Sequence, residues 1–406
     1  MPVKKFVPKL RSKKKYSFAT KALHSGYKAG VWDASLVPPL YLGVAHEFES
    51  TKFANDVFTG RREGFVYGRI NNPTCDIFEK RMAELENGEA AIGTASGMAA
   101  IFVTSIALSS AGDEIVSSDR VYGGTFHLFS DTLPRLGIKV NFVKNPHAVS
   151  SWEAAITPKT KFLYVETPSN PVLDVFDIEM LANLANKHHL PLVVDSTIAS
   201  PALTRPIELG ADIVAHSATK YICGNSTALG GVIVGKKALI DGIRVGVYRD
   251  IGPTLAPMNA WLMLNGLGTL AMRMENHSRN AQAVAEFLQA HHKISRVFYP
   301  GLSNSPYRAL VDKQMQGNAS ALLAFEMKGT KAGCSKFIEA LELTTHAAHL
   351  GDIRTLAIHP ASTTHEQLSA EAKKKAHISD TLVRMSIGLE DVGDIIADIR
   401  NALTKV

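Results

Sequence analysis

The chain has 406 residues, of which 46% are hydrophobic and 20% charged, the balance of a water-soluble globular protein. No apolar run approaches the ~18 residues that a membrane-spanning helix needs. The three cysteines (Cys75, Cys223, Cys334) show neither disulfide nor metal-ligand spacing, which excludes a disulfide scaffold and favours a reducing, cytoplasmic location.

The formal charge of +6 is a property of the N-terminal tail. Residues 1–15 carry seven basic groups and no acidic ones, so the remaining chain is close to neutral. We therefore expect no nucleic-acid partner. Apolar residues in the tail have helical spacing, but Pro8 interrupts them and the segment is not serine-rich. We expect a solvated arm, with an organellar signal as the alternative.

Residues 16–60 contain few periodic runs, which is typical of an extended arm that embraces a partner subunit. A helix over 74–86 and a strand over 90–92 follow, and a second helix opens at Ser96-Gly97-Met98 and runs to about residue 108. A serine–glycine turn at a helix N-terminus offers free N–H groups to a phosphate. The dinucleotide fingerprint G-x-G-x-x-G is absent, which argues against a Rossmann dehydrogenase.

Apolar strands and helices then alternate along the chain. Strands are expected at 114–117, 140–143, 162–165, 190–195 and 212–215, and an amphipathic helix at 177–189. This alternation predicts right-handed crossovers and a mainly parallel sheet covered by helices on both faces.

Two of these strands run into polar residues. One ends in Asp195, and the next is followed by Ser217, Thr219 and Lys220. In open α/β sheets, ligands bind at the carboxyl ends of strands. Desolvation makes the free amine of a lysine accessible near neutral pH, and the hydroxyls suit a phosphate. With a carboxylate for a pyridinium nitrogen, the pattern points to pyridoxal phosphate (PLP); a surface lysine and a capping aspartate are the alternatives.

The second half of the chain has a different character. Residues 240–250 read as helical, 251–257 as a break and 258–288 as one long helical stretch, which places a domain boundary near Pro257. Strands at 322–327 and 382–387 indicate a smaller α/β lobe. Arg384 lies within an apolar strand and needs an anion, either a substrate or a structural aspartate. The histidines of 349–365 lack metal-ligand spacing, so we expect no metal site.

Three motifs resemble the Cys/Met-metabolism family of PLP-dependent enzymes: Glu166-Thr-Pro-Ser-Asn170-Pro, Val194-Asp195-Ser-Thr197 and His216-Ser-Ala-Thr-Lys220-Tyr. The resemblance covers about residues 19–404. It implies an aspartate-aminotransferase-like (fold type I) α/β fold with a basic tail and N-terminal arm (1–60), a large PLP-binding domain (61–256) and a C-terminal α/β domain (257–406). It also implies a homotetramer, a dimer of dimers with shared active sites.

The same resemblance implies roles for individual residues. Lys220 holds the cofactor and acts as a base, and Tyr122 stacks on the ring as a second catalytic group. Arg384 binds the substrate carboxylate beside His349 and Leu350. The remaining cofactor-binding residues are Gly97, Met98, Asn170, Asp195, Thr197, Ser217 and Thr219, together with Tyr67 and Arg69, which reach the cofactor of the neighbouring subunit.

Members of this family replace or eliminate the γ-substituent of sulfur-containing or O-acylated amino acids. Tyr122-Gly-Gly124-Thr and the run from His359 through Thr364 to His365 look more like O-acetylhomoserine sulfhydrylases, which use a thiol or sulfide and form homocysteine. Methionine γ-lyases usually have cysteine where this chain has Gly124. The short chain favours methionine γ-lyase as the alternative, followed by cystathionine γ-synthase or γ-lyase. A non-catalytic protein acting through its basic tail is the alternative from another class.

Overall fold

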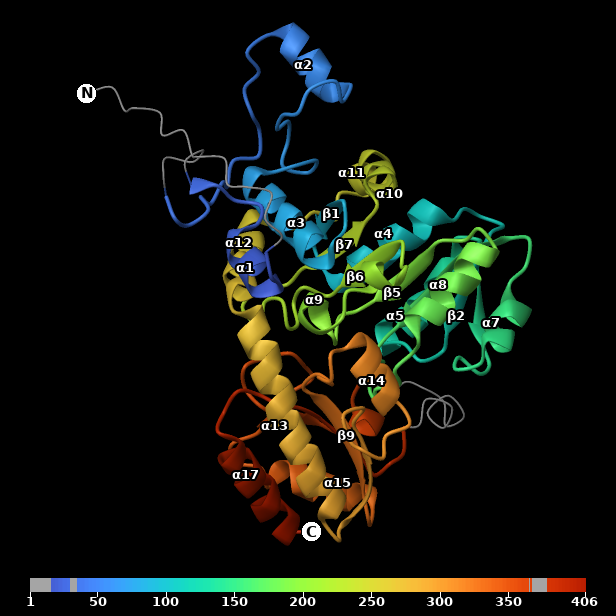
Figure 1. Ribbon diagram of the computed structural model, residues 1–406, viewed down its shortest axis with the longest axis vertical. Helices are drawn as coiled ribbons and strands as arrows, with labels where there is room; N and C mark the ends of the chain where they lie inside the picture. Colours follow the sequence, from blue (N-terminus) through green and yellow to red (C-terminus); the bar gives the residue numbers. More distant parts are fainter. Residues whose placement is uncertain (1–15, 30–34, 365, 367–377) are drawn as a thin grey trace.

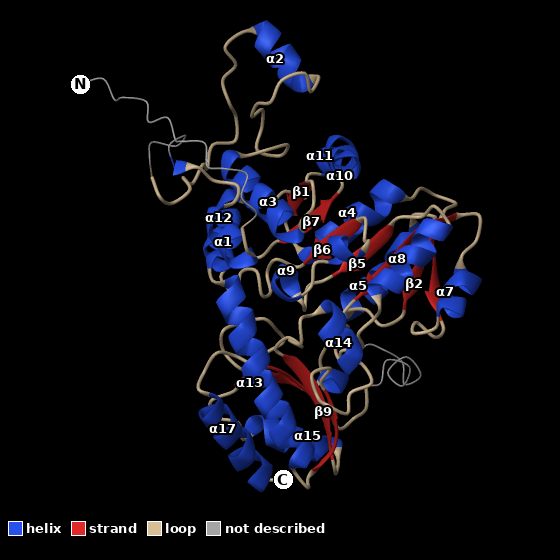
Figure 2. Cartoon of the chain, in the orientation of Figure 1, coloured by secondary structure: helices blue, strands red, loops and turns tan. Residues whose placement is uncertain are grey.

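The computed structural model describes residues 16–29, 35–364, 366 and 378–406, so the basic tail and His365 lie outside the described residues. Two β-sheets organise the chain, and Figures 1 and 2 show the larger one above the smaller one, with a long helix running alongside the latter. The strands of the larger sheet lie within residues 90–235 and those of the smaller sheet within residues 294–386.

The larger sheet has seven strands in the order β1-β7-β6-β5-β4-β2-β3. Strands β2 to β6 pair in parallel, whereas β7 is antiparallel to both of its neighbours. The mainly parallel α/β sheet is therefore confirmed, but β7 is not among the strands expected from the sequence. The strands are β1 (Ala90–Thr94), β2 (Glu114–Ser118), β3 (Lys139–Val143), β4 (Thr160–Glu166), β5 (Leu192–Asp195), β6 (Ile213–His216) and β7 (Gly231–Gly235).

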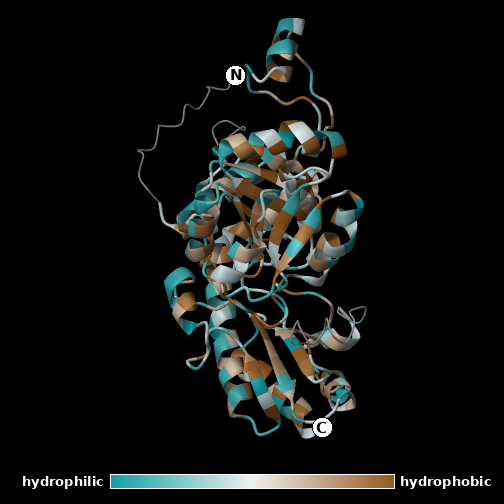
Figure 3. Ribbon diagram, turned by 90° about the vertical axis from the view of Figure 1, so that its right-hand side faces the viewer, coloured by the Kyte–Doolittle hydropathy of each residue, from teal (hydrophilic) through white to brown (hydrophobic). Residues whose placement is uncertain are grey.

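Both faces of this sheet are covered, as its continuous apolar strands require. One face packs against α4, α5 and α10, and the other against α3, α7 and α8. In Figure 3 the strands are accordingly coloured mostly as hydrophobic. The helices are α3 (Pro73–Glu86), α4 (Gly97–Leu108), α5 (Gly123–His127), η2 (Leu128–Thr132), α6 (Leu133–Arg135), α7 (Val149–Ala155), α8 (Ile178–Lys187), α9 (Ser200–Leu203), η3 (Pro206–Leu209), α10 (Lys237–Ile243), η4 (Arg244–Tyr248) and α11 (Arg249–Ile251).

The smaller sheet has five strands in the order β10-β11-β12-β9-β8. Only β10 and β11 pair in parallel. Its strands are β8 (Ile294–Phe298), β9 (Leu322–Met327), β10 (Thr345–His346), β11 (Leu356–Ile358) and β12 (Leu382–Ser386), and its helices are α13 (Leu270–Ala290), α14 (Arg308–Gln314), α15 (Lys331–Glu339), η5 (Pro360–Ser362) and α17 (Val392–Thr404). The domain division at residues 256/257 remains a prediction.

The expected single helix over 258–288 is two helices, α12 (Pro257–Gly268) and α13, which meet at Thr269. The break has a local cause, because the carbonyl of Gly266 accepts hydrogen bonds from the backbone N–H of Thr269 and from Nη2 of Arg273. Gly266 also lets α12 approach the backbone after Lys220, since a Cβ there would lie 2.3 Å from the carbonyl oxygen of Ile222.

The N-terminal segment is less extended than its sequence suggests, because it contains α1 (Phe18–His24) and α2 (Thr51–Phe58). Figure 1 shows α2 projecting well away from the rest of the chain. Large apolar side chains along this segment are more than half exposed, among them Leu36, Leu42, Val44 and Phe58.

Candidate functional site

A pocket of about 230 Å³ lies at the carboxyl ends of β4, β5 and β6. These strands are parallel neighbours, so the residues that end them meet at one edge of the sheet. Further residues come from the N-terminus of α4, from the loop before β11 and from β12. Among the predicted site residues, the pocket brings together Gly97, Met98, Tyr122, Asn170, Asp195, Thr197, Ser217, Thr219, Lys220, His349, Leu350 and Arg384.

The amine of Lys220 lies inside this pocket, 3.3 Å from Nδ1 of His349. Burial and the nearby positive charge of Arg384 lower the pKa of Lys220 to about 8. Burial and the charge of Lys220 lower the pKa of His349 to about 4, so its imidazole is neutral at pH 7. A neutral imidazole can accept a hydrogen bond from the lysine. The amine is thus available as a nucleophile or base at slightly alkaline pH.

Two buried carboxylates lie behind the lysine. Asp195 accepts a hydrogen bond from the backbone N–H of Thr197 at 3.0 Å and one from the hydroxyl of Tyr164 at 3.4 Å. Burial raises the pKa of Asp195, and the contacts with Thr197 oppose this rise. Burial and the charge of Asp195 raise the pKa of Glu166 well above its usual range. A cation beside Asp195 would favour its charged form.

The N-terminus of α4 faces the opposite side of the pocket. Ser96 caps the helix by accepting the N–H of Ala99 at 3.1 Å. The amides of Gly97 and Met98 have no carbonyl partner within their own helix, as is general for a first helical turn. A Cβ at Gly97 would lie 2.6 Å from Cβ of Ser217, so glycine allows that serine to approach the amides. This close arrangement is a cradle for an anion.

The two remaining hydroxyls of this region have backbone partners. Thr197 accepts the N–H of Ser217 at 2.8 Å. Thr219 donates to the carbonyl of Gly230 at 3.1 Å and accepts the N–H of the same residue at 3.0 Å. These bonds fix the loop that leads to Lys220.

Arg384 reaches the pocket from the middle of β12. Its Nη1 donates to Oδ1 of Asn170 at 3.1 Å, and its Nη2 donates to the carbonyl of His349 at 3.0 Å. Its buried Nε has no partner in the described part of the chain, where no carboxylate forms an ion pair with it. Burial lowers the pKa of Arg384 to about 10. A buried guanidinium with a spare donor suits an anionic ligand such as a carboxylate.

Tyr122 lies at the mouth of the pocket with a half-exposed side chain, and its backbone N–H donates to Oε2 of Glu166 at 2.6 Å. Gly124 lies against its ring, since a Cβ at this position would be 2.6 Å from Cε1 of Tyr122 and 3.3 Å from Sδ of Met98. The size of residue 124 therefore determines where the tyrosine ring can lie.

Tyr67 and Arg69 are not among the residues that line this pocket. The guanidinium of Arg69 donates to the carbonyl of Arg249 and lies 6.0 Å from the centre of the Tyr67 ring. Tyr67 is 44% exposed. Their predicted contact with a neighbouring subunit's cofactor therefore remains a prediction.

Several pocket residues were missed as site residues by sequence reasoning. Glu166 ends β4 as Asp195 ends β5, and it bonds the backbone of both Tyr122 and Asn170. Its position at the end of a buried strand was the available signal. Ser96, Ile198, Leu229 and Thr364 also line the pocket. Ser96 and Thr364 lie in runs that the sequence analysis names, whereas Ile198 and Leu229 do not.

These residues fit PLP in their chemistry. A lysine with a lowered pKa, a buried aspartate and a helix N-terminus supply an amine, a partner for a pyridinium and a phosphate cradle. The spare buried Nε of Arg384 leaves a donor for a carboxylate.

Comparisons with known proteins agree with this chemistry. The chain is 39% identical to O-acetyl-L-homoserine sulfhydrylase of Corynebacterium glutamicum, over 96% of this chain and 98% of that protein. It is 41% identical to L-methionine gamma-lyase of Pseudomonas putida, over 97% and 98% of the two chains. O-succinylhomoserine sulfhydrylase of Pseudomonas aeruginosa is 42% identical over 90% of each.

A crystal structure of a putative O-acetylhomoserine (thiol)-lyase from Campylobacter jejuni superimposes with a TM-score of 0.92 at 38% identity, covering 96% of this chain and 100% of that one. That structure contains N'-pyridoxyl-lysine-5'-monophosphate. The family model for Cys/Met metabolism PLP-dependent enzymes matches residues 19–404. The chain therefore belongs to the Cys/Met-metabolism family of PLP-dependent enzymes and has their fold type I architecture.

Proposed function

We propose that this enzyme catalyses γ-replacement on O-acetylhomoserine, with sulfide or a thiol as the incoming group and homocysteine as the sulfide product. The choice of O-acetylhomoserine over methionine rests on one observation: Gly124 lies against the ring of Tyr122 at the mouth of the pocket. Without a side chain at 124, the ring can lie close to the backbone and leave room for an ester. Thr364, from the sulfhydrylase-like run, also lines the pocket.

Each pocket residue has a task in this proposal. Arg384 binds the substrate carboxylate, and its bond to Asn170 fixes the guanidinium. Once the substrate amine has taken its place on the cofactor, the free amine of Lys220 acts as the general base. It takes the Cα proton, gives that proton up again, and then takes a proton from Cβ, so that the γ-substituent can leave with its electron pair. Tyr122 assists the leaving group at the mouth. Lys220 would hold PLP before substrate binds, and Asp195 and the amides of Gly97 and Met98 would hold it throughout; it would supply the electron sink that stabilises negative charge at Cα.

Methionine γ-lyase is the second candidate, and the alignments favour it in one respect. The alignment with the Corynebacterium glutamicum sulfhydrylase extends over 426 positions, more than the 406 residues of this chain, so that relative contains segments which this chain lacks. The alignment with the Pseudomonas deceptionensis methionine gamma-lyase extends over 392 positions and 96% of this chain. Cystathionine γ-synthase or γ-lyase is the third candidate.

A comparison of the two substrates in separate assays tests the proposal. Purified enzyme receives equal concentrations of O-acetylhomoserine with sulfide or of methionine alone. We expect homocysteine to form faster than methanethiol and 2-oxobutyrate. Faster release of methanethiol would overturn the proposal and leave the family membership intact. O-succinylhomoserine and cystathionine belong in the same panel, because the fold does not distinguish these substrates.

We also propose a cytoplasmic homotetramer, a dimer of dimers with shared active sites. The exposed apolar side chains of the projecting N-terminal segment support a protein partner, which would remove them from water. Tyr67 and Arg69, which do not line their own chain's pocket, support sharing. None of the helices in the described residues combines the length and hydropathy that crossing a membrane requires.

A further inference from the structure

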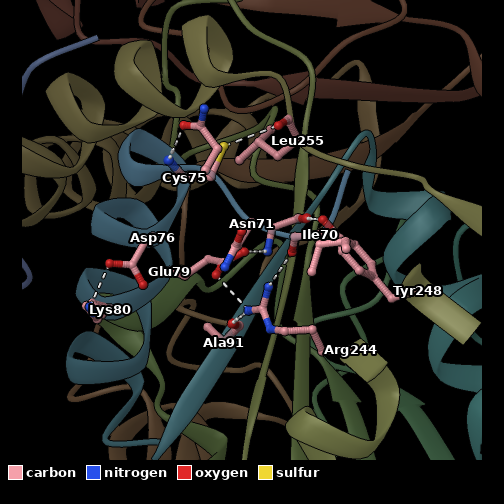
Figure 4. A network of polar contacts seen from close by, with 12 residues as sticks. Ile70, Asn71, Cys75, Asp76, Glu79, Lys80, Ala91, Arg244, Tyr248 and Leu255 are labelled. Atoms are coloured by element: carbon pink, nitrogen blue, oxygen red, sulfur yellow. Dashed lines mark hydrogen bonds and ion pairs between the residues drawn. The ribbon is translucent and has the colours of Figure 1, made fainter. Parts of the chain in front are cut away.

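A cluster of buried and partly buried polar side chains connects α3, β1 and η4, outside the pocket (Figure 4). Glu79 accepts the backbone N–H of Gly93 at 2.8 Å and forms an ion pair with Nη2 of Arg244 at 2.7 Å. The same Nη2 donates to the carbonyl of Ala91 at 2.7 Å. The hydroxyl of Tyr248, one helical turn after Arg244, donates to the carbonyl of Gly93 at 2.8 Å.

Glu79, Arg244 and Tyr248 together form what we call the β1 clamp. Glu79 is 8% exposed and Tyr248 is 4% exposed, whereas the side chain of Arg244 is 22% exposed and so is only partly removed from water. Removing two charges from water is costly, and a pair of well-packed apolar residues often stabilises a fold as well or better. Packing alone therefore gives no reason for an ion pair here. The directed bonds to two backbone positions of β1 indicate that the clamp fixes the position of this strand.

In one direction, β1 leads into the phosphate cradle of the pocket. The hydroxyl of Thr94, the last residue of β1, donates to the carbonyl of Ser96 at 2.9 Å, and the N–H of Ala95 donates to the carbonyl of Pro253 at 2.7 Å. Gly97 follows with its amide in the pocket. A shift of β1 would therefore move the N-terminus of α4.

In the other direction, the clamp supports Arg69. The helical segment that contains Arg244 and Tyr248 continues into α11, where the carbonyl of Arg249 accepts a hydrogen bond from Arg69. Nη1 of Arg244 lies 3.5 Å from the carbonyl of Ile70. Gly252, in the left-handed region at φ +73°, leaves space for the side chain of Arg69, because a Cβ there would lie 2.9 Å from its Cδ.

We propose that Glu79, Arg244 and Tyr248 are positioning residues for PLP. They hold the Ser96–Met98 cradle of one subunit in a fixed relation to Arg69, which serves the cofactor of the neighbouring subunit. The inference rests on the shared sites of the proposed assembly and is independent of which γ-substituent leaves.

The test uses the full-length apoprotein, titrated with PLP in the absence of substrate. Arg244→Leu alone would leave the charge of Glu79 buried and unpaired, which is strongly destabilising. The double variant Glu79→Gln/Arg244→Leu removes both charges, and the new amide oxygen can still accept the N–H of Gly93. We expect its apoprotein to melt within a few degrees of the wild type. Its PLP dissociation constant should rise roughly tenfold, as expected when one or two positioned hydrogen bonds are lost.

A matched control removes an ion pair that lies on the surface of the neighbouring helix. Lys237 and Asp241 of α10 form an exposed pair at 2.7 Å. Lys237→Ala/Asp241→Ala should change neither the melting temperature nor PLP affinity. Tyr248→Phe, which removes only the bond to Gly93, should weaken PLP binding about threefold.

Unchanged PLP affinity in the folded double variant would overturn the proposal. A loss of affinity that merely parallels a fall in the apoprotein melting temperature would also overturn it, because a general structural role predicts that pattern. In an Arg69→Ala background the clamp mutations should raise the PLP dissociation constant by a smaller factor than in the wild type, because part of their effect passes through Arg69. If the clamp mutations still weakened PLP binding tenfold in the Arg69→Ala background, the link to Arg69 would be refuted. A wrong substrate assignment would appear in the comparison of substrates and would leave this titration unaffected.

Discussion

The protonation states of the pocket depend on how Lys220, His349 and Arg384 act on one another. The pKa of Lys220 is lowered to about 8 and that of His349 to about 4. Because the pKa of Lys220 is the higher of the two, a proton shared by these groups stays on the lysine. His349 is therefore a hydrogen-bond acceptor for Lys220 and a poor proton acceptor from it. Lys220 remains the proposed base of the pocket.

The lowered pKa of Lys220 predicts a pH dependence for cofactor loading. Only the free amine reacts with the aldehyde of PLP, so the reconstitution rate of the apoprotein should rise with pH and level off above about pH 8. Arg384→Gln removes a positive charge that disfavours the ammonium form. The pKa of Lys220 should then rise, and at pH 7.5 the rate should fall by up to about tenfold per pKa unit. Stopped-flow absorbance measures the rate.

A surface arginine provides the control for this pH profile. Arg308 pairs with Asp312 on α14 and does not line the pocket. Arg308→Gln should leave the midpoint of the profile where it is. An identical midpoint in Arg384→Gln would show that the charge of Arg384 does not act on Lys220.

Gly124 offers a test of substrate preference at a single position. A side chain there must displace the ring of Tyr122, whose Cε1 would lie 2.6 Å from the new Cβ. Gly124→Cys should therefore narrow the room for an ester and shift the ratio of kcat/KM values towards methionine. One contact of this kind changes the ratio of kcat/KM values by a factor that corresponds to about 1–3 kcal/mol of activation free energy. The measurement compares both substrates in wild type and variant; a constant ratio would mean that position 124 does not set the preference.

At the scale of secondary-structure elements, the N-terminus of α4 is tightly packed against the loop that leads to Lys220. A Cβ at Gly97 would meet Cβ and Oγ of Ser217 at 2.6 and 2.9 Å. Gly97→Ala should push the cradle away from the Lys220 loop and weaken PLP binding by roughly tenfold or more, as measured by equilibrium titration of the apoprotein.

Gly242 is a matched control, because it lies within α10 and a Cβ there would meet nothing within 4 Å. Gly242→Ala should leave PLP affinity unchanged and stabilise the fold by about 0.5–1 kcal/mol, the usual gain for this exchange in a helix. Equal weakening of PLP binding by both substitutions would mean that crowding at Gly97 is not the cause.

Sequence patterns predicted the strands that are buried on both faces of the sheet and the strands that lead into polar residues. Asp195 and Lys220 could be identified because each follows a continuous apolar strand, a pattern that is local. The antiparallel β7 could not, since its flanking glycines indicate a loop and its partners β1 and β6 are distant in sequence. The end of α12 at Thr269 depends on bonds to the carbonyl of Gly266, which apolar periodicity does not reveal.

At the scale of the whole molecule, the site is assembled from segments that no single stretch of sequence connects. Arg384 of the smaller sheet meets Asn170 beside the larger one, a contact between residues far apart in the chain. Their proximity could be inferred only from the family resemblance. Arg69 presents the converse case, because a residue expected at the cofactor lies outside its own chain's pocket. The proposed second subunit would account for this difference, because Arg69 would then serve the neighbouring chain's site.

Complementation between two inactive variants tests the second subunit. If Lys220 and Arg69 of one site come from different chains, a mixed pair of Arg69→Ala and Lys220→Ala subunits contains one intact and one doubly defective site. Random mixing makes about half of the pairs mixed, so about a quarter of all sites should be intact. The enzyme that is unfolded and refolded as an equal mixture should therefore regain about a quarter of wild-type activity, well above either parent. Mass spectrometry confirms mixing, and no recovery in confirmed mixed oligomers would place Arg69 in its own subunit's site or outside the chemistry.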